Sequence, residues 1–387
     1  MAAQGSVEPV TTGTCLLHIG PYKSGSTAIQ RAAAGRRAEL AAHDVAYPGS
    51  GINHRWGFSA LSGFTWGWSG ADARRAPDDL GTDLLAEVAR ARTTARVWLS
   101  YERLCVLEEA AARELCDRIG APVHVVIGLR PLRSLLPSEW QQLVKNGRRT
   151  GALDHWAHRK LRAVTTGGPK AGHLDHARLV ERWAGVLGVD AVSCIALDSR
   201  RHDVLTDAFE ALLGLPGGLL APAAENRHHL NRSLTASEAA VVAAVAERLR
   251  GSGIGHGDYQ RIVSQGVIRS LRSREPATGE PRLRLSPVTW ARAATVDREA
   301  AARIADLGVR VFGDLGVYSG ERDVPPGSAA PLEVVEDPVP LAVAVAAALG
   351  AAEPSLRPPD LAAVPARRLA GALLRRARQH VRQGFGG

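Results

Sequence analysis

The sequence predicts an α/β fold in which a central parallel sheet is covered by helices on both faces. Two observations predict this class. Short apolar runs alternate along the chain with longer stretches of helical periodicity. The runs are apolar at nearly every position, which is typical of parallel strands buried on both faces. In such folds ligands bind at the carboxyl ends of the strands, so we searched those ends for chemistry.

The apolar runs predict four strands, at Thr14–Ile19, Ala95–Tyr101, Pro122–Leu129 and Asp190–Leu197. Helical periodicity predicts helices between them, at Gly25–His43, Asp83–Thr93, Glu108–Ile119, Leu132–Asn146, Leu174–Leu187 and Asp203–Leu213. After Asn231 the pattern is helical, with Ser237–Arg250 and Arg298–Leu307 the clearest segments. The polar stretch Arg272–Ser286 is expected to be a loop over one edge of the site.

Composition divides the chain into four parts. We expect a disordered N-terminus over residues 1–13 and one domain over residues 14–320. A Pro/Ala-rich linker region follows at residues 321–362. Residues 363–387 form a predicted basic amphipathic helix, which suits weak contact with an anionic membrane surface or docking on the protein itself.

Charge and cysteine content exclude several classes of protein. The net charge of +9 is not accompanied by basic runs interleaved with aromatic residues, so we expect no nucleic-acid partner. The four cysteines are far apart, without a C-x-x-C pair, which argues against a structural metal. The N-terminus lacks the pattern of a signal peptide, and we expect a cytoplasmic protein.

A phosphate loop follows the first predicted strand. In Gly20-Pro21-Tyr22-Lys23-Ser24-Gly25-Ser26-Thr27 the two glycines keep the spacing of the nucleotide loop G-x-x-x-x-G-K-[ST]. Ser26, however, stands where that loop has its lysine, and Lys23 lies earlier. Only four of the 48 Lys and Arg residues are lysine, so a lysine here is unlike the rest of the chain. A loop with this change is not suited to bind a γ-phosphate. The alternative to a phosphate loop is a glycine-containing turn that only connects the strand to the helix.

A second segment carries an arginine at the end of a strand. Arg130 follows the run Pro122–Leu129, and Ser138 lies on the helix predicted after it. The planar guanidinium makes bidentate contacts with phosphate oxygens.

These two segments together resemble the PAPS-dependent sulfotransferases, which have a P-loop-type fold; PAPS is 3′-phosphoadenosine 5′-phosphosulfate. The residues of these two segments are most similar to those of actinobacterial members of that family. The resemblance covers roughly residues 14–315. It implies that Lys23 meets the bridging oxygen of the donor and that the loop binds the 5′-phosphate through Tyr22, Lys23, Ser24, Gly25, Ser26 and Thr27. It also implies that Arg130 and Ser138 bind the 3′-phosphate.

The resemblance further implies a general base at a strand end. Glu102, which follows Ser100 and Tyr101, is the first candidate, and His54 is the second. Transfer of a sulfuryl group requires positioning, charge stabilisation and one proton acceptor, and it requires no metal.

The sequence departs from the family at two points. Cytosolic members place a tryptophan where this chain has Ala28, and an R-K-G segment near the C-terminus is missing. The residues that contact adenine are therefore not assigned.

The acceptor is expected to be a hydroxyl or amine on a sugar, lipid or secondary metabolite. It would be bound by the segments Tyr47–Gly70 and Gly147–Gly172, where Trp66, Trp68 and Trp156 offer flat faces. Two other functions remain open. One is a P-loop kinase with Glu102 or Asp198 as its metal-binding acid; the other is a scaffold that acts through the basic C-terminal helix.

Overall fold

The computed structural model describes residues 8–66, 74–148, 150–168, 171–201, 203–221, 232–250 and 255–320. The expected linker region, the C-terminal basic helix and Trp68 lie outside these residues. The chain divides into two compact units. The first unit consists of residues 1–135, 159–224 and 290–325, and the remaining residues form the second.

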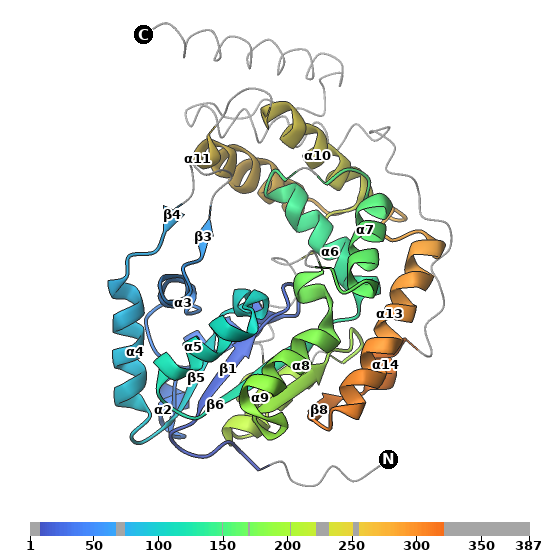
Figure 1. The fold of residues 1–387 in the computed structure, drawn as a ribbon. Coiled ribbons are helices and arrows are strands. Elements are labelled where there is room, and N and C mark those ends of the chain that lie inside the picture. The colour runs from blue at the N-terminus through green and yellow to red at the C-terminus, as the bar shows by residue number, and fades with distance from the viewer. Residues whose placement is uncertain are drawn as a thin grey trace, which may run out of the picture. The chain divides into compact units, whose positions relative to one another are not determined.

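A six-stranded sheet forms the centre of the first unit (Figure 1), with strand order β2-β5-β1-β6-β7-β8 and parallel pairing throughout. Its strands are β1 (Cys15–Ile19), β2 (Val45–Ala46), β5 (Arg96–Ser100), β6 (Val123–Leu129), β7 (Val192–Ala196) and β8 (Arg310–Gly313). The four predicted strands are confirmed, with slightly shorter bounds. A separate antiparallel pair, β3 (Thr65–Trp66) and β4 (Arg74–Arg75), lies outside the sheet.

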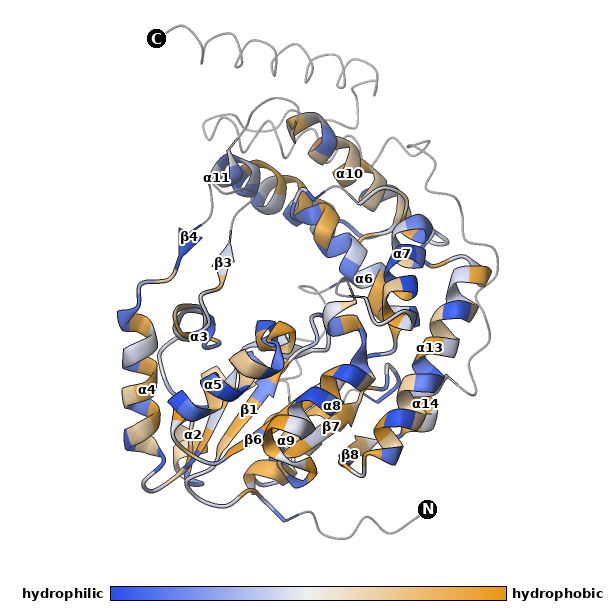
Figure 2. Ribbon diagram, in the orientation of Figure 1, coloured by the Kyte–Doolittle hydropathy of each residue, from blue (hydrophilic) through white to orange (hydrophobic). Residues whose placement is uncertain are grey.

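Helices cover both faces of this sheet, as predicted for the fold class. One face packs on α1 (Ser26–Gly35), α2 (Arg37–Ala41) and α9 (Val204–Leu213). The other packs on α3 (Arg55–Leu61), α4 (Asp79–Ala91), α5 (Glu109–Ile119), α8 (His176–Leu187) and α13 (Pro287–Asp306). Strand residues are mainly hydrophobic (Figure 2), and alternate residues of β1 enter the two cores. Cys15 and Cys194 are fully buried there, as expected of small hydrophobic residues.

Part of the N-terminal segment that was expected to be disordered packs on α9. Residues 8–13 belong to the described chain, and Val10 is buried. Its backbone N–H donates to the carbonyl of Leu212 over 2.9 Å. This part of the segment expected to be disordered is therefore packed on α9.

The second unit is helical. It contains most of α6 (Leu132–Lys145), α10 (Ala236–Arg250), α11 (His256–Tyr259), the π-helix η5 (Gln260–Ile268) and α12 (Arg269–Ser273), with part of α7 (Leu153–Thr165). No described helix is long and apolar enough to cross a membrane.

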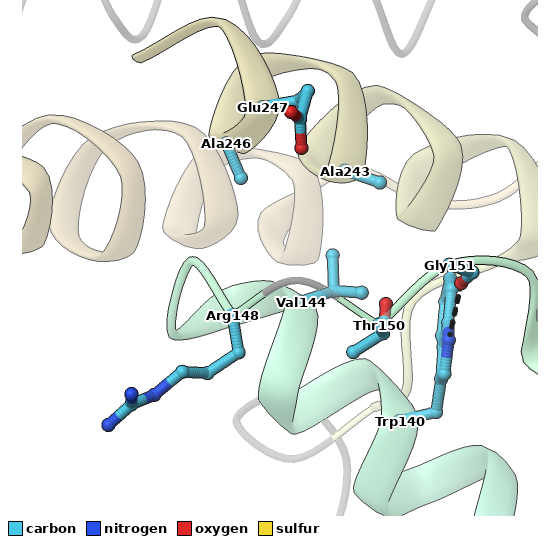
Figure 3. A pocket seen from close by; sticks show the side chains of 8 residues that line it. All are labelled: Trp140, Val144, Arg148, Thr150, Gly151, Ala243, Ala246 and Glu247. Carbon is cyan, nitrogen blue, oxygen red and sulfur yellow. Dashed lines mark hydrogen bonds between the residues drawn. The ribbon is translucent and has the colours of Figure 1, made fainter. Parts of the chain in front are cut away.

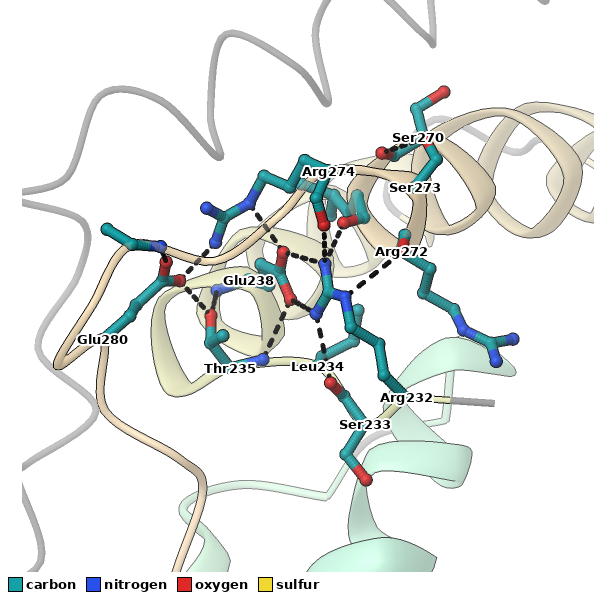
Figure 4. A network of polar contacts seen from close by, with 12 residues as sticks. Arg232, Ser233, Leu234, Thr235, Glu238, Ser270, Arg272, Ser273, Arg274 and Glu280 are labelled. Atoms are coloured by element: carbon teal, nitrogen blue, oxygen red, sulfur yellow. Dashed lines mark hydrogen bonds and ion pairs between the residues drawn. The ribbon is translucent and has the colours of Figure 1, made fainter. Parts of the chain in front are cut away.

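A buried carboxylate organises the loop that follows α12 (Figure 4). Glu238, which is fully buried, accepts hydrogen bonds of 2.7 Å from Arg232 and from Arg274. Arg274 also pairs with Glu280. Two arginines compensate the charge of the buried carboxylate, which would otherwise be costly. Residues 274–286 are a loop, as expected, and these contacts fasten it within the second unit.

Candidate active site

The phosphate loop lies between β1 and α1, and both neighbouring strands hold it in place. The N–H of Gly20 donates to the backbone carbonyl of Glu102 at 3.2 Å, just beyond β5. The carbonyl of Gly20 accepts from the N–H of Gly128, in β6, at 3.2 Å. The loop therefore starts at the carboxyl edge of the sheet, where parallel sheets bind their ligands.

Two positions in the loop require glycine. A Cβ on Gly20 would lie 2.8 Å from the carbonyl oxygen of Glu102. Gly25 has a φ of +86°, and a Cβ there would lie 2.9 Å from Cδ2 of Leu205. The left-handed conformation at Gly25 turns the chain directly into α1.

The start of α1 has the features of an anion site. No side chain caps this helix, and its first turn contains no acidic residue. The hydroxyl of Ser26 is buried and has no hydrogen-bond partner among the described residues. Ser24 is different, because its hydroxyl donates to the carbonyl of Pro21 over 2.7 Å. Free N–H groups, the helix dipole and an unpaired hydroxyl together suit a phosphate.

The other loop residues are placed as follows. Lys23 and Thr27 are exposed, and Lys23 has a left-handed φ of 67°. Tyr22 is half-buried and its ring contacts that of His173 edge-on, with ring centroids 4.9 Å apart. Burial raises the pKa of the Tyr22 hydroxyl well above its usual value, so this phenol stays protonated.

Arg130 joins the loop to the end of β6. Its Nη1 donates to the carbonyl of Lys23 over 2.7 Å, and its Nε donates to Oγ of Ser134 over 3.3 Å. Partial burial lowers the pKa of this guanidinium, which nevertheless remains charged. Among the described residues its partners are neutral oxygen atoms, so the arginine carries a positive charge at the loop without a carboxylate beside it.

Ser138 was expected to act together with Arg130. It is half-buried on α6 and belongs to the second unit, whereas Arg130 belongs to the first. Ser134, one helical turn beyond Arg130, is the serine that contacts the guanidinium. The i, i+4 spacing could have suggested Ser134 from the sequence.

Glu102 begins the short helix η1 (Glu102–Val106) directly after β5. Its Oε2 accepts a hydrogen bond of 3.0 Å from the side-chain amide of Gln30. The same amide nitrogen donates to Oγ of Ser100 at 3.0 Å, and Oε1 of Gln30 accepts from Nδ2 of Asn53 at 3.3 Å. Gln30 is almost fully buried, so the amide holds the carboxylate in one orientation.

The network continues from Gln30 through Ser100 to His18. Because Oγ of Ser100 accepts from Gln30, it can donate its own proton to Nδ1 of His18, 2.9 Å away. His18 is fully buried, and burial lowers its pKa to about 4, so the ring is neutral near pH 7. Sequence reasoning missed Gln30. The signal was a polar residue at a position of α1 that faces the core, next to Ile29.

His54, the second candidate base, has both ring nitrogens occupied by backbone groups. Nδ1 accepts from the N–H of Ser100 at 3.0 Å, and Nε2 lies 3.0 Å from the carbonyl of Pro48, to which it donates. The ring is buried, which lowers its pKa to about 4. His54 therefore fastens the preceding loop to the end of β5.

A pocket of about 500 Å³ lies in the second unit (Figure 3). It is lined by Trp140, Val144, Arg148, Thr150, Gly151, Ala243, Ala246 and Glu247. The indole N–H of Trp140 donates to the carbonyl of Gly151 over 3.1 Å. Three of these residues, Arg148, Thr150 and Gly151, belong to the segment Gly147–Gly172 that was expected to bind the acceptor. None of the residues expected to bind the donor or to act as the base lines the pocket. In the described part of the chain, no group of three or more His, Cys, Asp or Glu residues is arranged to hold a metal ion.

The chain was compared with family models, curated proteins and solved structures. No family model and no curated protein matches this sequence. Among solved structures, a sulfotransferase from Alicyclobacillus acidocaldarius is similar to this chain, with 16% identity and a TM-score of 0.37. The match covers 62% of this chain and 95% of that protein. A likeness of this size describes neither the activity nor the ligands of the chain, so the functional argument depends on the site.

Proposed function

We propose that this protein is a PAPS-dependent sulfotransferase, which transfers the sulfuryl group of PAPS to a hydroxyl or amine of an acceptor. One observation carries the proposal: the hydrogen bond from Arg130 to the carbonyl of Lys23. It joins a charged, partly desolvated guanidinium to a phosphate loop. Unlike ATP, PAPS carries a 3′-phosphate in addition to its 5′-phosphosulfate. It therefore offers one anionic group to the guanidinium of Arg130 and another to the ammonium group of Lys23.

The residues of the loop fit the 5′ end of this donor. The N–H groups at the start of α1 and the unpaired hydroxyl of Ser26 would bind the 5′-phosphate. Lys23 would stabilise the charge that develops on the bridging oxygen as the sulfur–oxygen bond breaks. Arg130 would bind the 3′-phosphate, in the role that the sequence also suggests for Ser138.

Glu102 is proposed as the general base. Gln30 holds one of its carboxylate oxygens, and the other, which has no hydrogen-bond partner among the described residues, would take the proton of the acceptor. As the acceptor oxygen forms its bond to sulfur, Glu102 takes that proton, and 3′-phosphoadenosine 5′-phosphate (PAP) leaves. We favour Glu102 over His54 because both nitrogens of His54 are engaged by backbone groups.

Ligand-induced thermal stabilisation tests this proposal without knowledge of the acceptor. A ligand that binds the native state stabilises it, and at equal concentration the tighter ligand raises the melting temperature more. PAP is expected to stabilise the protein more strongly than ATP with Mg²⁺ at equal concentration. Stronger stabilisation by ATP with Mg²⁺ would favour a kinase and contradict the proposal.

A further inference from the structure

Two tryptophans form an accessible aromatic pair in the first unit. Trp56 lies in the first turn of α3, and its side chain is 41% exposed. Trp66 is the last residue of β3, and the two rings meet edge to face with centroids 4.7 Å apart. The guanidinium of Arg55 lies over the ring of Trp56 at 4.2 Å. Exposure of such a large apolar ring costs solvation free energy, and this is a common property of binding surfaces.

Hydrogen bonds connect the loop that precedes Trp56 to the proposed base. Asn53, at the end of the loop that leads into α3, donates to Gln30, and Gln30 donates to Glu102. His54, between Asn53 and α3, is fixed to Ser100 at the end of β5. The start of α3 is thus fastened to the end of β5, two residues before Glu102.

Trp66 is connected to the same place from the other side. Arg103, the neighbour of Glu102 in η1, donates through Nη1 to the carbonyl of Thr65 over 2.7 Å. The guanidinium of Arg103 also lies 4.4 Å from the ring centre of Phe64. Both tryptophans are therefore anchored, by separate contacts, to residues beside the proposed base at the carboxyl edge of the sheet.

We infer that Trp56 and Trp66 form the platform on which the acceptor lies, and that the acceptor is a hydroxyl compound with a flat apolar face. This inference depends on the proposed function, because it requires Glu102 to receive the proton of the acceptor. A pyranose ring has such a face in its C–H groups, and a phenol has one in its π surface. Trp156, which was expected to share this role, is buried in the second unit and offers no exposed face.

The test measures binding of two defined probes to PAP-saturated protein by saturation-transfer NMR. Methyl β-D-glucopyranoside represents a carbohydrate acceptor, and 4-nitrophenol represents an aromatic one. Trp56→Ala and Trp66→Ala are each expected to raise the dissociation constant of the bound probe about tenfold. Val189→Ala is the control. Val189 is 40% exposed and lies just before β7, at the amino ends of the parallel strands, whereas the proposed site lies at their carboxyl ends.

Each outcome has one meaning. Loss of pyranoside binding in both tryptophan variants assigns a carbohydrate acceptor, and loss of phenol binding assigns an aromatic one. The platform is overturned if neither probe binds the wild type, or if the tryptophan variants bind the probes as the wild type does. Calorimetry of PAP on the same samples separates the two proposals, since failure of the platform leaves PAP binding intact, whereas absence of PAP binding removes the proposed function.

Discussion

Glu102 and His54 both lie at the end of β5, yet their surroundings give them different roles. Glu102 is half-buried, and among the described residues it receives one hydrogen bond, from Gln30, so its other oxygen could serve the proposed acceptor. His54 is buried and bonded to backbone at both nitrogens. The sequence could name both residues as candidates, but one backbone partner of His54, the N–H of Ser100, comes from a residue 46 positions away and could not be foreseen.

Replacement of Glu102 by Gln tests the proposed base. Glu102→Gln keeps the shape of the side chain but removes the proton acceptor, so turnover is expected to fall by about 10²-fold or more. PAP affinity is expected to stay unchanged. The measurement is transfer of labelled sulfate from PAPS into the fractions of a cell lysate that accept it with the wild type. In parallel, His54→Gln is expected to lower thermal stability while folded protein stays active; a folded, inactive His54 variant beside an active Glu102 variant would reverse the assignment.

Gln30 is a positioning residue, and its replacement by Leu removes the amide that orients Glu102. Turnover in Gln30→Leu is expected to fall roughly 10- to 100-fold, because a misplaced base loses its alignment with the acceptor. PAP affinity should not change. Gln142→Leu is the matched control, since Gln142 also donates from Nε2 to a side-chain oxygen, that of Asn146, but in the second unit. Equal rates in the two variants would show that Glu102 needs no support from Gln30.

At the scale of elements, the strands that are buried on both faces could be predicted and the others could not. The strands β1, β5, β6 and β7 are nearly continuous apolar runs. The edge strand β8 begins at the exposed Arg310 and ends at the exposed Gly313, and it was missed because it has no such run. The helix expected over Gly25–His43 is broken at Arg36, whose φ of −120° is not helical.

The phosphate loop depends on the left-handed conformation at Gly25. Gly25→Ala is expected to cost about 1–2 kcal/mol of stability from the positive φ alone, and to weaken PAP binding because the start of α1 shifts. Gly35→Ala, at the far end of the same helix, is the control: a Cβ there meets nothing within 4 Å. That control is expected to be neutral or stabilising by up to about 1 kcal/mol. Chemical unfolding and calorimetry measure both effects, and a Gly25 variant as stable and as tightly binding as the Gly35 variant would contradict this role.

At the scale of the whole molecule, the buried histidines determine how stability depends on pH. Burial lowers the pKa values of His18, His54 and His124 to about 4 and that of His176 to about 3. The unfolded chain binds protons below about pH 6.5, whereas these folded histidines do not. Their contribution to stability is therefore complete above pH 6.5 and is lost as the pH falls toward 4.

One buried carboxyl group acts in the opposite direction. Burial raises the pKa of Asp297 to about 7, so its contribution decreases as the pH rises through that value. The histidines outnumber it, and the free energy of unfolding in urea is expected to be smaller at pH 5 than at pH 7. The pH dependence should be shallower in His124→Gln, which removes one buried titrating ring. Equal unfolding free energies at the two pH values would contradict this account.

The division into two units could not be predicted from composition. Within the described residues, the chain passes between the units inside the helices α6, α7 and α13 and not at a proline- or glycine-rich linker. The two segments that are proposed to bind the donor could nevertheless be found in the sequence, because the phosphate loop and Arg130 each follow a buried strand. Their direct contact and the side-chain network around Glu102 depend on tertiary packing, which local patterns do not encode.

Arg130 is proposed to recognise the 3′-phosphate of the donor, and calorimetry with PAP and ADP measures this recognition. ADP lacks the 3′-phosphate, so Arg130→Ala is expected to weaken PAP binding by roughly 1.5–3 kcal/mol and to change ADP binding far less. Arg113→Ala is the control, because Arg113 is an exposed arginine on α5 that pairs with Glu109 at the surface. It should leave both affinities unchanged. If Arg130→Ala weakens PAP and ADP equally, or weakens neither, the claim is contradicted.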